Sequence, residues 1–264
     1  MKTINPITPE NVSIHGLRIY FRHYSTVSVD VAAGETTVPV AAGLWFVPGE
    51  DLLINGRIYT LAAKDTSGNL LSLATPLAAD LPSGTKVKKA GWYDMGHVQN
   101  PARTNDQTTS EIQSARYGKL QTVKVVTTSI TRSMTFESIS AADPVVLALY
   151  HGRIPTETDL GTFIVDDASP VFGELLVVQP SAVAGDPTML EYKPSANLRG
   201  TDQAGSDGET TTALTFEASF LQDDLYRVPP QFDPTTPPAP MGVRARIAPQ
   251  SLDAVLAVID GTGA

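Results

Sequence analysis

The amino-acid sequence predicts a mainly β protein, a β-sandwich with one flanking α-helix, interrupted near its start by a small all-β module. Two observations lead to this prediction. Short apolar runs separated by Gly, Pro, Asn and Asp recur along most of the chain, as in all-β proteins. From residue 127 to 137, small polar residues occupy every second position, which is the period of a β-strand.

The first third of the chain contains two predicted units. Residues 12–24 predict an opening strand. Residues 27–89 predict a compact module of about five or six short strands, because apolar runs alternate with turn signals there. Within this module, Asn55-Gly56 marks a hairpin turn.

Residues 92–98 predict a further strand, and the polar stretch 99–119 predicts a long connecting loop. The alternating segment 120–138 predicts a long strand. One of its faces carries hydroxyls and one carboxylate, while the other is mostly apolar. The polar face consists of Thr127, Ser129, Thr131, Ser133, Thr135 and Glu137.

Residues 140–151 predict the flanking helix, with Ser140 or Asp143 as its cap, Pro144 in its first turn and Gly152 at its end. Strands are predicted at 162–165, 174–179, 189–192 and 211–221, with a polar loop over 195–210. The last strand repeats the polar alternation, with Thr215, Glu217 and Ser219 on one face.

The C-terminal part begins with a proline-rich stretch, 228–240, which predicts an extended arm. Residues 251–259 predict either a short closing helix or an added strand, docked on their own core or on a neighbouring subunit. The predicted organisation is therefore a main domain (1–26 and 90–227), an inserted module (27–89) and an arm with a C-terminal segment (228–264).

Composition excludes several classes of protein. The 264 residues contain no cysteine, so no disulfide or thiolate metal site can form. The net charge is −9, and residues 157–224 hold thirteen acids against two bases. This acidity disfavours tight nucleic-acid binding, although acids also simply keep surfaces soluble. The start of the chain lacks the apolar core of a signal peptide, and we expect no membrane span and synthesis in the cytoplasm.

No catalytic residue, cofactor or metal is predicted. HExxH, GxSxG and P-loop patterns are missing from the sequence. His15 and His23 would share a strand face, an arrangement that arises by chance more often than as a metal site. Asp202, Asp207 and Glu209 sit in a Gly-rich loop without the EF-hand spacing of a calcium site.

The segment from Trp92 to Gly152 resembles the major tail tube protein of long, non-contractile (siphovirus-type) bacteriophage tails. The resemblance lies in the order of its parts: GWYDMGHV, a polar loop, RYG, the alternating strand, and a helix ending in LALY. The strand at residues 17–21 and the strand at 214–220 fit the same plan. Together these parts cover about 150 residues, and no single motif among them is specific.

The resemblance implies a structural virion protein whose hexameric rings close an inner β-barrel and stack into the tail tube, through which genomic DNA passes during ejection. It implies a polar lumen lined by strands 122–137 and 211–221. It also implies that the loop 99–119 contacts the adjacent ring, through Arg103, Thr104, Asp106, Glu111, Arg116 and Tyr117. Implied partners are further copies of the chain, the tape measure protein, and tail terminator and tip proteins.

Two other functions fit the same sequence. One is a tube protein of a phage-related secretion or tailocin-like apparatus. The other is an exported adhesin or decoration protein that forms no tube. Assembly distinguishes them, since a tube protein forms rings or tubes and an adhesin does not.

Overall fold

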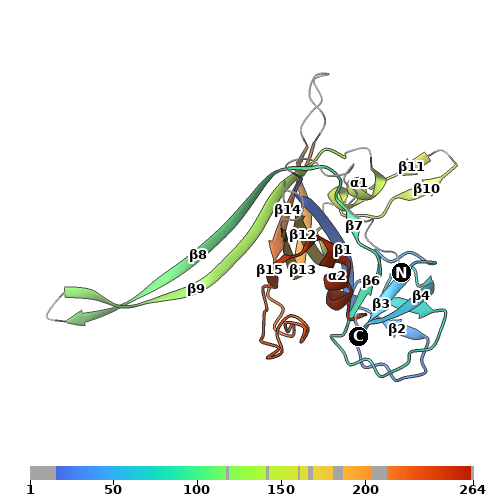
Figure 1. Cartoon of the computed structure of the whole chain (residues 1–264), viewed down its shortest axis with the longest axis horizontal. Helices are drawn as coiled ribbons and strands as arrows, with labels where there is room; N and C mark the ends of the chain where they lie inside the picture. The colour runs from blue at the N-terminus through green and yellow to red at the C-terminus, as the bar shows by residue number, and fades with distance from the viewer. Residues whose placement is uncertain are drawn as a thin grey trace, which may run out of the picture.

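The structure, a computed structural model, describes residues 16–116, 119–140, 143–159, 161–165, 169–180, 187–203 and 213–262. The protein is mainly β. One large antiparallel sheet has the strand order β2-β5-β4-β3-β6-β1-β12-β13-β14-β9-β8, and the sheet is not closed into a barrel (Figure 1). β15 (Val243–Ile247) adds to β13, and β7 (Tyr93–Asp94) adds to β1.

The small module occupies one end of this order. It contains β2 (Thr37–Pro39), β3 (Asp51–Ile54), β4 (Arg57–Lys64), β5 (Leu70–Leu73) and β6 (Lys86–Lys89). A separate cluster of buried side chains, among them Phe46 and Leu61, forms its core. The Asn55-Gly56 hairpin is confirmed: Ile54 pairs with Arg57, and both turn residues have positive φ, as a type I′ turn requires.

β1 (Arg18–Thr26) joins the module to the rest of the protein. Its first six residues pair with β12 (Val171–Gln179), and its last three pair with β6. β13 (Thr188–Gln203) and β14 (Leu214–Phe220) extend the sheet beyond β12. A small separate hairpin of β10 (Thr156–Thr158) and β11 (Gly161–Phe163) follows the first helix.

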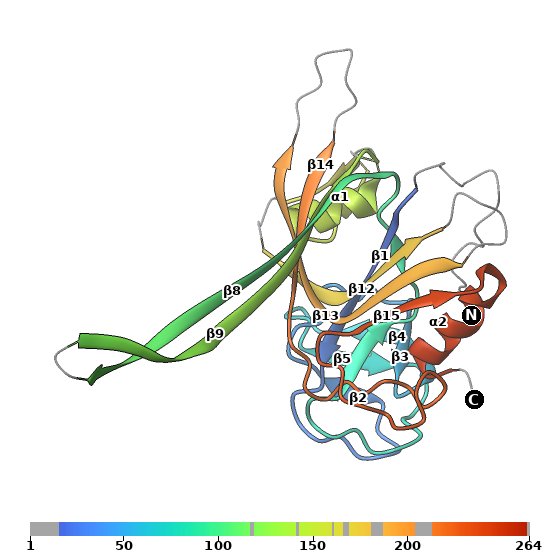
Figure 2. The same cartoon turned by 60° about the vertical axis from the view of Figure 1, so that its left-hand side comes forward.

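Two helices cover the two faces of the central sheet (Figure 2). α1 (Pro144–His151) packs Val146 and Leu149 into the larger core. As predicted, Asp143 caps it by accepting hydrogen bonds from the backbone N–H groups of Val145 and Val146, and Gly152 ends it in the left-handed conformation.

α2 (Leu252–Asp260) is the closing helix predicted from residues 251–259. It buries Leu256 and Ile259 against Tyr20, Leu176 and Tyr192 of its own chain. Of the two predicted structures, the segment therefore forms the helix, and in the single chain this helix packs on its own core.

Three predictions of secondary structure were wrong. Within the predicted loop 99–119, residues 99–116 are not a loop, because β8 (Val98–Arg116) pairs along its length with β9 (Lys119–Ser138). The start of the predicted loop 195–210 belongs to β13, and the predicted strand 92–98 shrinks to β7. The long β8–β9 hairpin projects away from the body in both views (Figures 1 and 2), and the sequence of β8 has no apolar alternation that would have marked it as a strand.

The packed face of the sheet yields a first prediction. Phe216 is fully buried and stacks on Phe136, with ring centroids 5.4 Å apart, whereas Phe172 is 46% exposed. We expect Phe216→Ala to lower the free energy of unfolding by about 3–5 kcal/mol because it leaves a cavity. Phe172→Ala, the control, should cost less than about 1.5 kcal/mol. Urea denaturation measures both, and equal losses would contradict this packing.

Candidate functional site

A polar face runs across β9 and β14, the two strands predicted to carry it. In antiparallel pairs, directly opposite residues point to the same side of the sheet. The register places Thr215 opposite Glu137, Glu217 opposite Thr135, and Ser219 opposite Ser133. The two polar rows, which lie about 80 residues apart in the sequence, therefore form one surface. We call this surface the polar face.

The reverse side of the same strands is packed. Met134, Phe136, Phe216 and Ala218 are each at most 1% exposed and belong to the core beneath α1. The prediction of one packing face and one polar face is confirmed for this part of β9 and for β14. Burial of the apolar residues fixes the register, because a slip of one residue would exchange the two faces.

The carboxylates of the polar face are held by neighbouring side chains. Glu137 Oε2 accepts hydrogen bonds from Gln99 Nε2 and Asn100 Nδ2, each at 2.9 Å. Glu217 pairs with Arg199 of β13, with Nη2 and Oε2 2.5 Å apart. Sequence reasoning missed Arg199 because residues 195–203 were assigned to a loop. The alternation of Ala196 and Leu198 with Asn197 and Arg199 was the signal that could have placed it on a strand.

The predicted lumen residues differ in how far their side chains are exposed. Thr131 is exposed, while Thr135, Glu137, Thr215, Glu217 and Ser219 are half-buried. Ser133 is buried, with only 8% of it exposed, and it lines a depression at the base of the hairpin. Thr127 and Ser129 lie on the β9 backbone, where the pairing register shifts between them, and their side chains are outside the described part of the chain.

Five of the six residues predicted to contact an adjacent ring lie on the hairpin strand β8, not on a loop. Thr104 pairs with Ser133 and Asp106 with Thr131, so both extend the polar face. Arg103 pairs with Met134 and points to the opposite side, where its Nη2 lies 3.0 Å from Glu191 Oε2. Glu111 and Arg116 are on the distal part of β8, and Tyr117 lies outside the described residues.

A buried ion cluster joins the module, the central sheet and α2. Arg22 of β1 and Glu174 of β12 are fully buried, with Nη2 and Oε2 2.5 Å apart. Arg22 Nη1 lies 2.6 Å from Asp260 Oδ1 on α2, and Lys88 Nζ of β6 lies 2.7 Å from Glu174 Oε1. The Arg22 guanidinium also lies over the ring of Trp92, 4.1 Å from its centroid.

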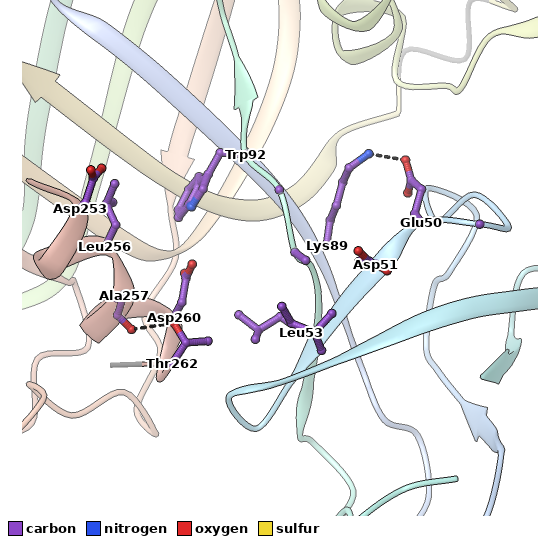
Figure 3. A pocket seen from close by; sticks show the side chains of 14 residues that line it. Glu50, Asp51, Leu53, Lys89, Trp92, Asp253, Leu256, Ala257, Asp260 and Thr262 are labelled. Carbon is purple, nitrogen blue, oxygen red and sulfur yellow. Dashed lines mark hydrogen bonds and ion pairs between the residues drawn. The ribbon is translucent and has the colours of Figure 1, made fainter. Parts of the chain in front are cut away.

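A cavity of about 150 Å³ lies beside this cluster, between the module and α2 (Figure 3). Leu53, Trp92 and Leu256 line it together with several acids. Figure 3 shows Lys89 directed to Glu50, and Asp260 is engaged by Arg22. Its described lining contains no histidine or serine, and its one hydroxyl group, that of Thr262, lies 3.3 Å from the carbonyl oxygen of Ala257. The cavity lies where the module and α2 pack together.

The structure describes one of the two histidines that were considered as a metal site. His23 is buried beside Phe46, and its Nδ1 lies 2.8 Å from the carbonyl oxygen of Phe172. Burial lowers the pKa of His23 to about 4, so the ring is neutral at pH 7. Within the described ranges no group of three or more His, Asp or Glu side chains is arranged to hold a metal. His15, Asp207 and Glu209 lie outside those ranges.

The same part of the chain contains no helix that is both long and apolar enough to cross a membrane. In a comparison with known proteins, no protein family and no curated protein matches the chain. What the protein does must therefore be argued from the surfaces described above.

The ion cluster yields a second prediction. Burial opposes ionisation of Glu174, but Arg22 and Lys88 outweigh it and lower its pKa to about 2. Glu174→Gln leaves both cations without their buried partner, so we expect a loss of about 3–5 kcal/mol at pH 7. The exposed pair gives the matched control, and Glu217→Gln should cost at most about 1 kcal/mol.

Acid unfolding tests the same assignment. Because the folded-state pKa of Glu174 lies below the usual 4.5, its stabilising effect is complete above pH 4.5 and is lost as the pH falls toward 2. Urea unfolding from pH 7 to pH 2 should therefore show wild type and Glu174→Gln converging in that window. A difference that stays constant with pH would rule out the carboxylate as its source.

Proposed function

We propose that this protein is a structural subunit of a phage tail tube, which forms rings by self-assembly and stacks them into a channel for DNA. The observation that carries the proposal is the polar face of β9 and β14. It is built of hydroxyls and carboxylates and is backed by a tightly packed core. The ring would be a hexamer, as in the tail proteins that the sequence resembles. The protein would then be located in the virion tail.

The chemistry of the polar face suits a channel wall for DNA. Phosphates are bound tightly where lysine and arginine neutralise them. Glu217 neutralises the one described cation on this face, Arg199, and Glu137 adds a further negative charge. A surface of hydroxyls and carboxylates leaves a sliding polyanion without charged partners, so it favours passage over retention.

The open sheet supplies a reason for assembly. β8 is the last strand in the sheet order, and none of the other described strands pairs with its outer edge. Exposed edges are templates for pairing with another chain, and closure into a barrel removes them. A neighbouring subunit whose strand pairs with β8 would continue the polar face from one chain to the next.

The remaining parts support the same arrangement. The β8–β9 hairpin projects far from the body and offers a contact to an adjacent ring (Figure 1). The module lies at the end of the strand order farthest from β8, which fits a position on the tube exterior. A tube of a phage-related secretion or tailocin-like apparatus would use the same geometry with a different cargo.

The first test of this function is assembly. Asp106 and Thr131 are direct partners, so replacing residues 107–130 by an Asn-Gly turn keeps the base of the hairpin in register. We expect the full chain to form rings or tubes in negative-stain images, and the shortened chain to stay folded but form no stacked tubes. A wild-type chain that remains monomeric at high concentration and in virions contradicts the proposal.

The second test concerns the channel wall. Glu137→Lys with Glu217→Lys turns two carboxylates into cations, and the second change also places a cation beside Arg199. We expect tubes to assemble but DNA release to slow, because phosphates would now be bound. Release is followed by a DNA-binding dye after triggering virions. Glu35→Lys with Asp253→Lys, at two exposed sites away from the polar face, makes the same change in net charge and should leave release unaltered.

A further inference from the structure

Four cationic side chains converge at the root of the β8–β9 hairpin, on the side of the sheet opposite to the polar face. They are Arg103 of β8, Arg132 of β9, Lys193 of β13 and Arg244 of β15. These residues are up to 141 positions apart in the sequence. In the folded chain they nevertheless line one depression.

A single acid balances the four cations. Glu191 Oε2 lies 3.0 Å from Arg103 Nη2 and 2.9 Å from Arg244 Nη2, and its Oε1 lies 3.1 Å from Lys193 Nζ. No other Asp or Glu is among the described residues that line the depression. The site therefore keeps an excess of three positive charges in a protein whose net charge is −9.

The excess charge is partly exposed. The side chains of Arg103 and Arg244 are 42% and 58% exposed, whereas that of Glu191 is 7% exposed. Burial lowers the pKa of Lys193, Glu191 counteracts this, and the nearby Arg244 and Arg132 lower the pKa further. Each guanidinium carries five N–H donors in a planar fork that matches a carboxylate. Donors of both arginines therefore remain available to an incoming anion.

The depression has room for such a group. Its volume is about 420 Å³, and Phe220, Met241 and Val243 contribute apolar groups to its lining. Lys193 Nζ is fixed there by the carbonyl oxygen of Met241 at 3.1 Å and lies 4.8 Å from the centre of the Phe220 ring. A methylene stem ending in a carboxylate matches a lining that combines apolar groups with cations.

We propose that this depression, the basic socket, binds an acidic side chain of a second copy of this chain. The inference rests on the proposed function and specifies the chemistry of one contact between subunits. Two observations select a second copy as the occupant. The socket includes Arg103 and Asn105 of β8, so a chain that pairs with the open β8 edge arrives beside it. Outside the four cations and Glu191, the chain has 27 acids and 15 bases, so a second copy is rich in matching charge.

The test compares self-association of three full-length proteins by sedimentation velocity and negative-stain microscopy. They are the wild type, Arg103→Gln with Arg244→Gln, and the control Arg57→Gln with Arg227→Gln, which removes two exposed cations elsewhere. Glutamine keeps a polar, hydrogen-bonding side chain but removes the charge, and Lys193 remains to pair with Glu191. We expect the socket variant to associate about tenfold more weakly or worse, and the control to match the wild type.

Salt provides a second readout. Raising NaCl from about 0.1 M to about 1 M shortens the Debye length from about 10 Å to about 3 Å. Association of the wild type should weaken over this range, and that of the socket variant should change much less. A hexaglutamate peptide should compete with wild-type association at low salt, while inorganic phosphate at the same concentration should compete less.

Each outcome decides the inference. Wild-type rings that persist unchanged in the socket variant overturn the socket while leaving the tube function standing. If the wild-type chain binds hexaglutamate but never self-associates, the socket belongs to a different acidic partner. That result would contradict both the socket proposal and the tube proposal. Equal competition by phosphate and hexaglutamate would mean a general anion site and would overturn the assignment to an acidic side chain.

Discussion

The buried pair of Arg22 and Glu174 is the interaction on which the arrangement of the whole chain depends. β1 belongs both to the central sheet and to the edge of the module, and Arg22 is at the point where its partner strand changes. Around this pair meet β6 through Lys88, β12 through Glu174 and α2 through Asp260. An unpaired charge at this depth would be very costly, so the three units are held in one relative position.

That fixed junction leaves the opposite end of the sheet free for other contacts. The module and α2 cover the region near β1, whereas β14, β9 and β8 end in an open edge and a projecting hairpin. In the proposed assembly, stability and interaction are thus separated along the strand order. Apolar burial beneath α1 holds β9 and β14 in register, and their other face is free to carry hydroxyls and carboxylates that contribute little to the core.

The two charged regions near the hairpin serve opposite needs in the proposed tube. On the polar face, Glu217 neutralises Arg199, which keeps cations away from a passing phosphate backbone. On the reverse side, Glu191 neutralises only part of the charge of Arg103, Lys193 and Arg244. Since alternate residues of a strand point to opposite sides, adjacent positions such as Arg103 and Thr104 can serve a contact and a channel wall at once.

The sequence was sufficient where local chemistry decides the structure. Asn55-Gly56 can form its turn because both positions tolerate positive φ, and Asp143, Pro144 and Gly152 mark the ends of α1 by capping alone. The alternation of 131–137 and 214–220 indicated two faces before any contact was known. The loop predicted at 99–119 failed because the sequence of β8 is almost free of aliphatic residues, and apolar periodicity was the signal used.

By itself, then, the sequence determined that the chain is mainly β, where its best turns and helix lie, and which residues of two strands share a polar side. Only the tertiary structure decided that those two rows lie side by side in one surface and that Arg199 pairs with Glu217 there. It also decided that Arg103, Lys193 and Arg244 meet around Glu191. The physical reason is that periodicity reports which side of its own strand a residue is on. Strand order, register and sheet curvature depend on contacts between distant segments, and no local pattern encodes them.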